Sequence, residues 1–250
     1  MSSGASTIVQ TACQRHKSLG LAGVLAVVAV TLLPSAGCAQ AAVAPAPVGR
    51  TQILSVAASG VVFLLPGAVD LREGPPGCAP CSRSEIPWYD RWALTSERDG
   101  WSAASTVSLV GLAGATWYGL VRGRGRQGLT ELAASVEAAS WAVAVTQLSK
   151  AAFARNRPVL YTSAAAGAAG DVENRRSLPS GHASAAFALA TSYALAEWRR
   201  GNKLPGWLAL AAAGGIGTMR VLAGRHFPSD VATGAAIGSL SAVVVHRIRF

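Results

Sequence analysis

Charged residues are scarce in this chain. Only 14% of its 250 residues are Asp, Glu, Lys or Arg, whereas 51% are hydrophobic, and the mean hydropathy is +0.35. So few charges, together with many alanines and glycines, favour helices that pack closely in a membrane over a typical soluble surface. The length is that of one domain with an ample core.

Metal-binding patterns are also missing. Of the four cysteines, only Cys78 and Cys81 form a close pair. A zinc site needs further ligands, and the sequence has no second pair; a redox-active pair is disfavoured because no thioredoxin-like strand–helix pattern surrounds it. In an oxidising compartment Cys78 and Cys81 can instead form a disulfide. We therefore expect no metal and no other cofactor.

The excess of basic residues does not indicate nucleic acid binding. The chain has 22 basic and 12 acidic residues, a net charge of +10, but many cations stand in short clusters between apolar segments. These clusters are Arg122, Arg124 and Arg126; Arg199, Arg200 and Lys203; and Arg247 and Arg249. Such clusters are typical of the cytoplasmic ends of membrane helices, whereas a nucleic-acid interface needs a continuous basic face. The expected partner is a membrane and not nucleic acid.

Six apolar segments predict an all-α fold, a bundle of about six helices that can cross a membrane. They cover residues 52–69, 103–121, 128–149, 182–198, 205–223 and 230–246. The third segment is interrupted by Glu131, Glu137 and Gln147. It is therefore either a soluble amphipathic helix or a span whose polar residues face the bundle interior.

One topology accounts for the charge pattern. If the first segment crosses outward, loop 70–102 lies outside and the cationic clusters lie inside. Trp88, Tyr89 and Trp92 in this loop are then expected at the membrane surface, where aromatic rings are enriched.

The N-terminus reads as a signal peptide or membrane anchor over residues 1–41, with a linker at 42–50 and the main domain at 51–250. Basic residues precede an apolar run at 19–33, and Ala39 and Ala41 provide a cleavage pattern. Cleavage would leave the new N-terminus outside and reverse the first span. The alternatives are an uncleaved extra helix, a first segment that does not cross simply, or a secreted soluble helical protein.

Three short segments carry chemically versatile residues. Their functional side chains are Lys150 and Arg157 in the first, His182 in the second, and Arg220, His226 and Asp230 in the third. Arginine offers a fork of donors suited to phosphate oxygens, and lysine offers a point charge. Because catalysis on a phosphate ester is mostly positioning and electrostatic stabilisation, this set predicts phosphoryl transfer.

Local spacing suggests how the phosphate is held. Lys150 and Arg157 lie about two turns apart if their stretch is helical, and Pro158 would end that helix. Ser180 is expected to be the N-cap of a helix whose free N–H groups can bind an anion. Gly181 lets the backbone approach that anion closely.

The two histidines have separate expected roles. His182 is suited to protonate a leaving oxygen. Asp230, four residues after His226, can accept a proton from one ring nitrogen and free the other as a nucleophile. Two further arginines, Arg155 and Arg225, stand beside the cations of these segments and are left outside the predicted site.

These identities and spacings resemble the type 2 phosphatidic acid phosphatase (PAP2) family, relatives of bacterial acid phosphatases and vanadium haloperoxidases. The family pattern is Lys, six residues, Arg-Pro; Pro-Ser-Gly-His; and Ser-Arg, five residues, His, three residues, Asp. The resemblance covers roughly residues 100–250, and Met219 stands where the family has Ser. One lost hydroxyl predicts a weakened or rearranged phosphate pocket.

The resemblance implies a nucleophile, His226, that forms a phosphohistidine, and a general acid and then base, His182. It implies a metal-free phosphate site made by Lys150, Arg157, Ser180, Gly181 and Arg220. The implied enzyme hydrolyses a phosphomonoester or diphosphate of a lipid, such as phosphatidate, a polyprenyl diphosphate or a lipid A-like molecule. Its implied location is the bacterial inner membrane, with the site facing the periplasm or exterior. Alternatives are a soluble periplasmic acid phosphatase, a vanadium haloperoxidase and an inactive lipid-binding member.

Overall fold

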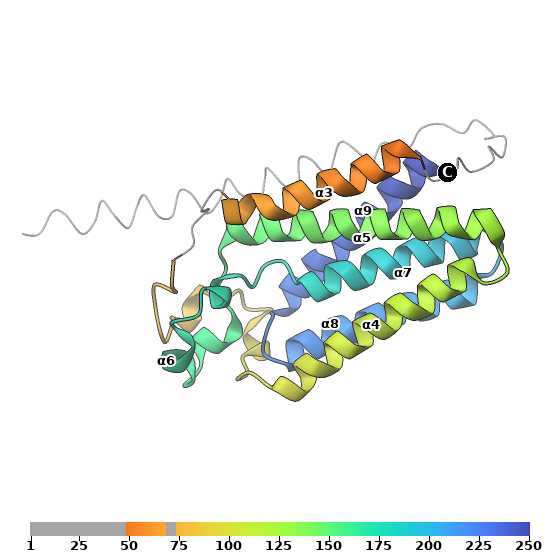
Figure 1. Cartoon of the computed structure of the whole chain (residues 1–250). Coiled ribbons are helices and arrows are strands. Elements are labelled where there is room, and N and C mark those ends of the chain that lie inside the picture. The colour runs from red at the N-terminus through yellow and green to blue at the C-terminus, as the bar shows by residue number, and fades with distance from the viewer. Residues whose placement is uncertain (1–48, 69–73) are drawn as a thin grey trace, which may run out of the picture. The chain divides into compact units, whose positions relative to one another are not determined.

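The computed structural model describes residues 49–68 and 74–250, and this part of the chain is helical without strands. The predicted signal peptide or anchor and residues 42–48 of the linker lie outside it. The long helices are α3 (Arg50–Ala68), α4 (Asp99–Val121), α5 (Gly125–Phe153), α7 (Gly181–Arg199), α8 (Lys203–Leu222) and α9 (Pro228–Arg249) (Figure 1). A short helix, α6 (Ala165–Ala168), lies in the connection from α5 to α7. The predicted all-α bundle is confirmed.

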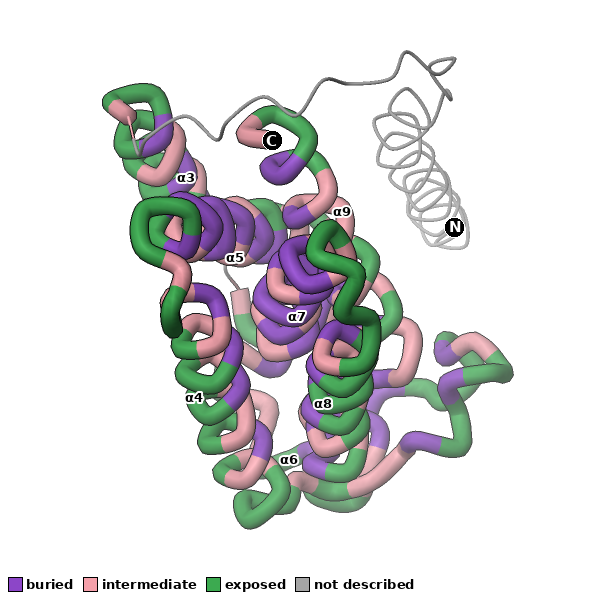
Figure 2. The backbone as a smooth tube through the Cα atoms, turned by 90° about the vertical axis from the view of Figure 1, so that its right-hand side faces the viewer, coloured by how far each residue is buried: buried purple, intermediate pink, exposed green. Residues whose placement is uncertain are grey.

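Helix α7 is the centre of the bundle. It packs against α4, α5, α8 and α9, and buried residues recur along its length (Figure 2). Many of these residues are alanines with no exposed surface, including Ala183, Ala186, Ala190 and Ala194. Small side chains allow several helices to approach one central helix closely.

The closest packing joins α7 to α9. A Cβ atom at Gly238 would lie 2.1 Å from the Ser184 carbonyl oxygen, and one at Gly234 would lie 2.4 Å from the Ser180 carbonyl oxygen. Only glycine fits at both positions, one turn apart on α9. The Ser180 N–H donates to the Asp230 carbonyl oxygen over 2.9 Å, so this contact also joins the N-terminal ends of the two helices.

Three helices, α3, α4 and α9, are long and apolar enough to cross a membrane, which fits a membrane protein. Helices α5, α7 and α8 do not meet that standard, so the six-span topology stays a prediction. The acidic residues of α5 lie in the interior, as one of our two alternatives expected: Glu131 and Glu137 are 1% and 3% exposed.

The cationic clusters gather at one end of the bundle. Arg199 and Arg200 pair with Glu131, Arg124 pairs with Glu197, and Arg249 pairs with Glu137. Ion pairs between helices satisfy these buried carboxylates and hold this end together. The ends of α5 and α8 and the beginnings of α7 and α9 lie at the opposite end (Figure 1).

We expect Gly238→Ala to lower the thermal unfolding midpoint of detergent-solubilised protein by about 2–10 °C, because the added methyl group overpacks the α7–α9 contact. The matched control is Gly214→Ala on α8, where a Cβ atom meets nothing within 4 Å. That control should leave the midpoint unchanged or slightly higher, since alanine favours a helix by about 0.5–1 kcal/mol over glycine. Equal midpoints for the two variants would contradict this role of the α7–α9 contact.

Candidate active site

The three predicted segments meet at one end of the bundle, where α5 and α8 finish and α7 and α9 begin. Lys150 lies in the last turn of α5, Arg220 in the last turn of α8, and Asp230 in the first turn of α9. His182 lies in the first turn of α7, and His226 lies in the turn between α8 and α9. The chain thus brings all three segments to the same end of the bundle (Figure 1).

The first segment differs from its predicted form. Helix α5 ends at Phe153, with Ala154 in the left-handed conformation at φ 46°, so Lys150 and Arg157 do not share one helix. Arg157 is extended, as expected for a residue before proline, and Pro158 opens a 3₁₀ turn. The Arg157 N–H donates to the Asn174 carbonyl oxygen over 2.8 Å. Arg157 is therefore positioned by a connecting segment rather than by a helix.

The second segment begins α7. Ser180 occupies the N-cap position, but its side chain makes no capping hydrogen bond. Gly181 is the first helical residue, and a Cβ atom there would meet only Thr146, at 3.9 Å. Protein packing does not require glycine at this position, which leaves room for a ligand next to the helix N-terminus.

His226 is held by an unexpected partner. Its Nδ1 atom lies 2.7 Å from the Ser177 carbonyl oxygen, and the ring is 2% exposed. The Asp230 carboxylate, which we expected to accept the ring proton, lies 3.9 Å from Nδ1. A carbonyl oxygen can only accept, so Nδ1 carries the hydrogen and Nε2 keeps its lone pair. The ring has the tautomer that a nucleophile requires.

Asp230 bonds elsewhere because it lies in the first turn of α9. Its carboxylate accepts from the Phe227 N–H over 2.8 Å, which satisfies a free donor at the helix N-terminus. It also accepts from the Ser177 hydroxyl and from Arg155, each over 2.5 Å. Asp230 therefore acts on His226 through Ser177.

The surroundings keep His226 uncharged. Burial first, and then the positive charges of Lys150, Arg220 and Arg157, hold the pKa of His226 well below its usual range, while the hydrogen bond to Ser177 opposes them. The ring thus remains neutral in mildly acidic solution. Three cations from separate segments of the chain therefore act on one imidazole.

Three buried donors in the site have no hydrogen-bond partner within the described part of the chain. They are the Nε atoms of Arg157 and Arg220 and the hydroxyl of Ser180. The other guanidinium contacts are partial: Arg157 reaches Glu173 over 3.3 Å, and Arg220 reaches the Ser102 and Ser105 hydroxyls over 3.0 and 3.2 Å. Buried donors without partners are costly unless a ligand satisfies them. A phosphate oxyanion fits this set.

His182 shares the same cations. The charges of Lys150 and Arg220 act on His182 as well as on His226. The His182 Nε2 atom lies 3.0 Å from the Thr106 hydroxyl of α4, and the ring is half-buried. His182 is thus closer to solvent than His226, as a group that exchanges protons with water needs to be.

The hydroxyls of α4 were missed by the sequence analysis. Ser102 and Ser105 bind Arg220, Thr106 binds His182, and the Ser108 hydroxyl lies 3.8 Å from the Met219 sulfur. Met219 supplies no hydroxyl of its own, and α4 supplies several beside it. A usable signal was present, since these hydroxyl residues all stand near the start of an otherwise apolar segment.

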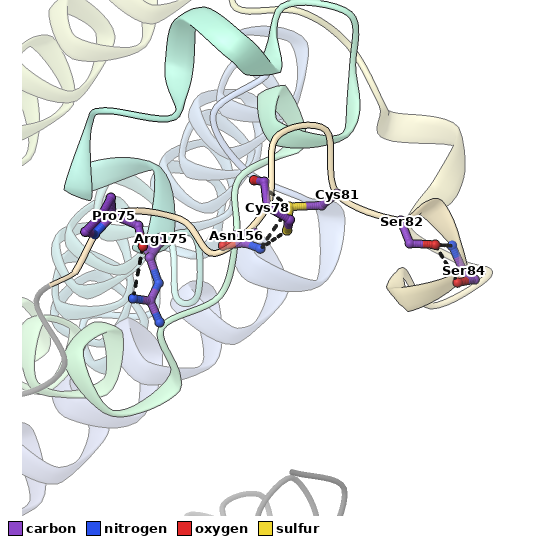
Figure 3. The surroundings of a disulfide bond; sticks show 7 residues. All are labelled: Pro75, Cys78, Cys81, Ser82, Ser84, Asn156 and Arg175. Atoms are coloured by element: carbon purple, nitrogen blue, oxygen red, sulfur yellow. Dashed lines mark hydrogen bonds between the residues drawn. A yellow bond between two sulfur atoms is a disulfide. The ribbon is translucent and has the colours of Figure 1, made fainter. Parts of the chain in front are cut away.

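The loop before α4 covers the segment that carries Arg157 (Figure 3). Cys78 and Cys81 are joined in a disulfide, and the Asn156 amide nitrogen lies 3.3 Å from the Cys81 sulfur. The Cys81 N–H donates to the Leu160 carbonyl oxygen over 2.8 Å. The disulfide loop therefore braces the segment that carries Arg157.

Within residues 49–68 and 74–250, no group of three or more His, Cys, Asp or Glu side chains is arranged to hold a metal ion. The candidate site combines two imidazoles with cations and hydroxyls, and the cations and hydroxyls are hydrogen-bond donors suited to an anion.

Comparison with known proteins agrees with this site. Residues 129–250 match the model of the PAP2 superfamily, and this region contains all three motif segments. No curated protein and no solved structure matches the chain. The match supports the assignment of this region to the PAP2 superfamily and, with it, a phosphatase-type function.

Proposed function

We propose that this protein is a metal-independent phosphatase that hydrolyses a phosphomonoester or diphosphate of a lipid through a phosphohistidine. The observation that carries the proposal is the set of buried donors on Arg157, Ser180 and Arg220, which have no partner among the described residues and accompany a neutral, oriented His226. Such donors stabilise charge on the equatorial oxygens of a phosphoryl group in transfer.

In the first step, the His226 Nε2 lone pair attacks phosphorus while the bond from phosphorus to the ester oxygen breaks. Burial, and then the charges of Arg220 and Lys150, lower the pKa of His182 to about 4. The negative charge of a bound substrate opposes that shift, so His182 can hold a proton in the complex and give it to the departing oxygen, and the alcohol leaves neutral. Lys150, Arg157 and Arg220 hold the phosphoryl oxygens, and their charges compensate those of the substrate.

In the second step, water attacks the phosphohistidine. His182, now neutral, takes one proton from the water, and the bond from phosphorus to Nε2 breaks. His226 recovers its lone pair, and inorganic phosphate leaves. The two histidines thus end the cycle in their starting protonation states.

The surface beside the site supports a lipid substrate. Trp88 and Trp92 in the loop before α4 are 80% and 72% exposed, and Trp101 at the start of α4 is 41% exposed. Aromatic rings of this kind are enriched at membrane surfaces. With three candidate membrane helices in the same chain, they would hold the site at the depth of a lipid headgroup. Our proposed orientation in a bacterial inner membrane faces the site outward.

His226→Ala should lower kcat by at least about 10⁴-fold, because it removes the ring nitrogen that is oriented to accept the phosphoryl group. His182→Ala should lower kcat for an alkyl ester by about 10²–10⁴-fold, the usual contribution of a general acid. With p-nitrophenyl phosphate the first step needs little help from an acid, whereas the second step still needs His182 as a base. The His182→Ala variant should therefore accumulate a phosphoenzyme with this substrate.

Labelled phosphate trapped by rapid quench, and located by mass spectrometry, measures this outcome. The wild type and His182→Ala should carry acid-labile phosphate on His226, and His226→Ala should carry none. Thermal unfolding midpoints serve as the folding control. Normal turnover by folded His226→Ala, or phosphate on another residue, would refute the mechanism.

The α4 hydroxyls generate a separate expectation. The double variant Ser102→Ala, Ser105→Ala leaves the buried Arg220 guanidinium with fewer partners and free to move. Hydrogen bonds to charged groups contribute about 1.5–3 kcal/mol, so kcat/KM should fall by about 10- to 100-fold. Ser108→Ala, which removes only the contact to the Met219 sulfur, is the control and should retain nearly full activity. Equal kcat/KM in the wild type, the double variant and Ser108→Ala would contradict the role of Ser102 and Ser105.

A lipid substrate predicts membrane retention and a preference for long chains. The protein should stay in the membrane pellet after carbonate extraction. In detergent micelles, phosphatidate, a polyprenyl diphosphate or a lipid A-like substrate should exceed glycerol phosphate in kcat/KM by at least about tenfold, since each buried methylene contributes about 0.8 kcal/mol. Release into the aqueous fraction without chain preference would select the soluble acid phosphatase. Halide oxidation that requires vanadate and peroxide would select the haloperoxidase.

A further inference from the structure

Arg155 forms a buried ion cluster next to the site, although no motif contains it. Its Nη1 atom donates to the Asp230 carboxylate over 2.5 Å, and its Nη2 atom donates to the Asp90 carboxylate over 2.8 Å. Asp90 and Asp230 have no exposed surface. The guanidinium also lies 4.4 Å from the centre of the Phe227 ring, next to His226 in the chain. One cation thus bridges two buried carboxylates beside the nucleophile.

Asp90 ties this cluster to the loop before α4. Its carboxylate accepts from the Ser229 N–H over 3.1 Å and from the Ser229 hydroxyl over 2.5 Å. Ser229 lies in the first turn of α9 and also accepts from Arg155 over 2.7 Å. The loop therefore holds Arg155 against α9 from the side opposite Asp230.

The cluster reaches the nucleophile through Ser177. The Ser177 N–H donates to the Arg155 carbonyl oxygen over 2.9 Å, and the Ser177 hydroxyl donates to Asp230 over 2.5 Å. The Ser177 carbonyl oxygen is the acceptor for His226 Nδ1. Arg155 therefore fixes Ser177 twice, by its own backbone and through Asp230, and Ser177 sets the direction of the ring.

The cluster also controls the charge that His226 experiences. Asp230 lies 3.9 Å from Nδ1, close enough for an unpaired carboxylate to favour the protonated ring. Arg155 opposes this by pairing with Asp230. The other charged groups around the ring are Lys150 from α5, Arg157 from the connecting segment and Arg220 from α8, with Asp90 one step further out on the loop.

We propose that Arg155, clamped between Asp90 and Asp230, is a positioning residue that holds His226 neutral and aims its Nε2 atom into the phosphate site. Arg155 is not a phosphate ligand in this proposal, because its side chain is engaged by the two carboxylates and Ser229. The proposal rests on the phosphohistidine chemistry proposed above, but its structural part can be measured without turnover.

The test is an NMR titration of ¹⁵N-histidine-labelled protein in detergent. The chain has only four histidines, so the signal lost in His226→Gln identifies the ring. Wild-type His226 should be the neutral Nδ1–H tautomer at pH 6.5. In Arg155→Met the protonation midpoint should rise by about one unit or more, the usual effect of an unpaired carboxylate at this distance.

Asp90→Asn is the matched comparison, because it disturbs the same cluster but removes a negative charge. It should leave the midpoint of His226 unchanged or lower. Arg83→Met, at an exposed arginine of the same loop, is the neutral control. The acid limb of the kcat/KM profile should move with the midpoint in each variant. If Arg155 had a merely structural role, Arg155→Met and Asp90→Asn would both lower activity, but Arg155→Met would not raise the protonation midpoint of His226 relative to Asp90→Asn.

An unchanged midpoint and tautomer in folded Arg155→Met would overturn the proposal. If that variant does not fold, Arg155→Gln takes its place: its amide carries no charge, so Asp230 still lacks a cationic partner, the midpoint should still rise, and an unchanged midpoint overturns the proposal equally. If the wild type shows the expected tautomer but releases no phosphate from any substrate, the proposed function fails while the positioning role stands. The two failures are thus distinguishable.

Discussion

The mutual repulsion of three cations, of which Arg157 and Arg220 are buried and Lys150 is partly buried, is the constraint on which the site depends. The charges of Arg157 and Arg220 oppose that of Lys150, and Glu173 offsets them only in part. Partly satisfied guanidinium groups add to this cost. A bound phosphate removes both penalties at once, so the end of the bundle is complementary to an anion with several oxygens. The fold must hold these groups together while the site is empty.

The helical framework meets this demand through close backbone packing. Alanines of α7 and glycines of α9 bring the helix ends together at distances that larger side chains would prevent. At the opposite end, ion pairs to Glu131, Glu137 and Glu197 hold the same helices in register. The loop before α4, with its disulfide and Asp90, closes the site end. Close packing and ion pairs thus hold the framework, while the site keeps buried donors on Arg157, Ser180 and Arg220 that have no partner among the described residues.

Departures from the expected geometry all concern how a residue is held. Asp230 is drawn to the N-terminus of α9 and to Arg155, so Ser177 takes over the contact with His226. Arg157 lies outside α5 because that helix already ends at Phe153, with Ala154 in the left-handed conformation. Hydroxyls from α4 surround Arg220 and approach Met219, where the family pattern has a serine. In each case a nearby backbone group or side chain provides a contact that the motif does not specify.

The order and spacing of apolar segments were enough to predict an all-α bundle, because helix formation and burial follow local periodicity. Motif identities were likewise enough to name the chemical groups, since phosphate chemistry requires particular donors at any site. Two details depended on contacts between residues far apart in the chain. The Ser177 oxygen that orients His226 is 49 positions away from it, and Arg155, which neutralises Asp230, is 75 positions away from that residue. Such long-range contacts arise only when helices pack in three dimensions. The roles of Ser177, Arg155 and Asp90 could therefore be recognised only in the tertiary structure.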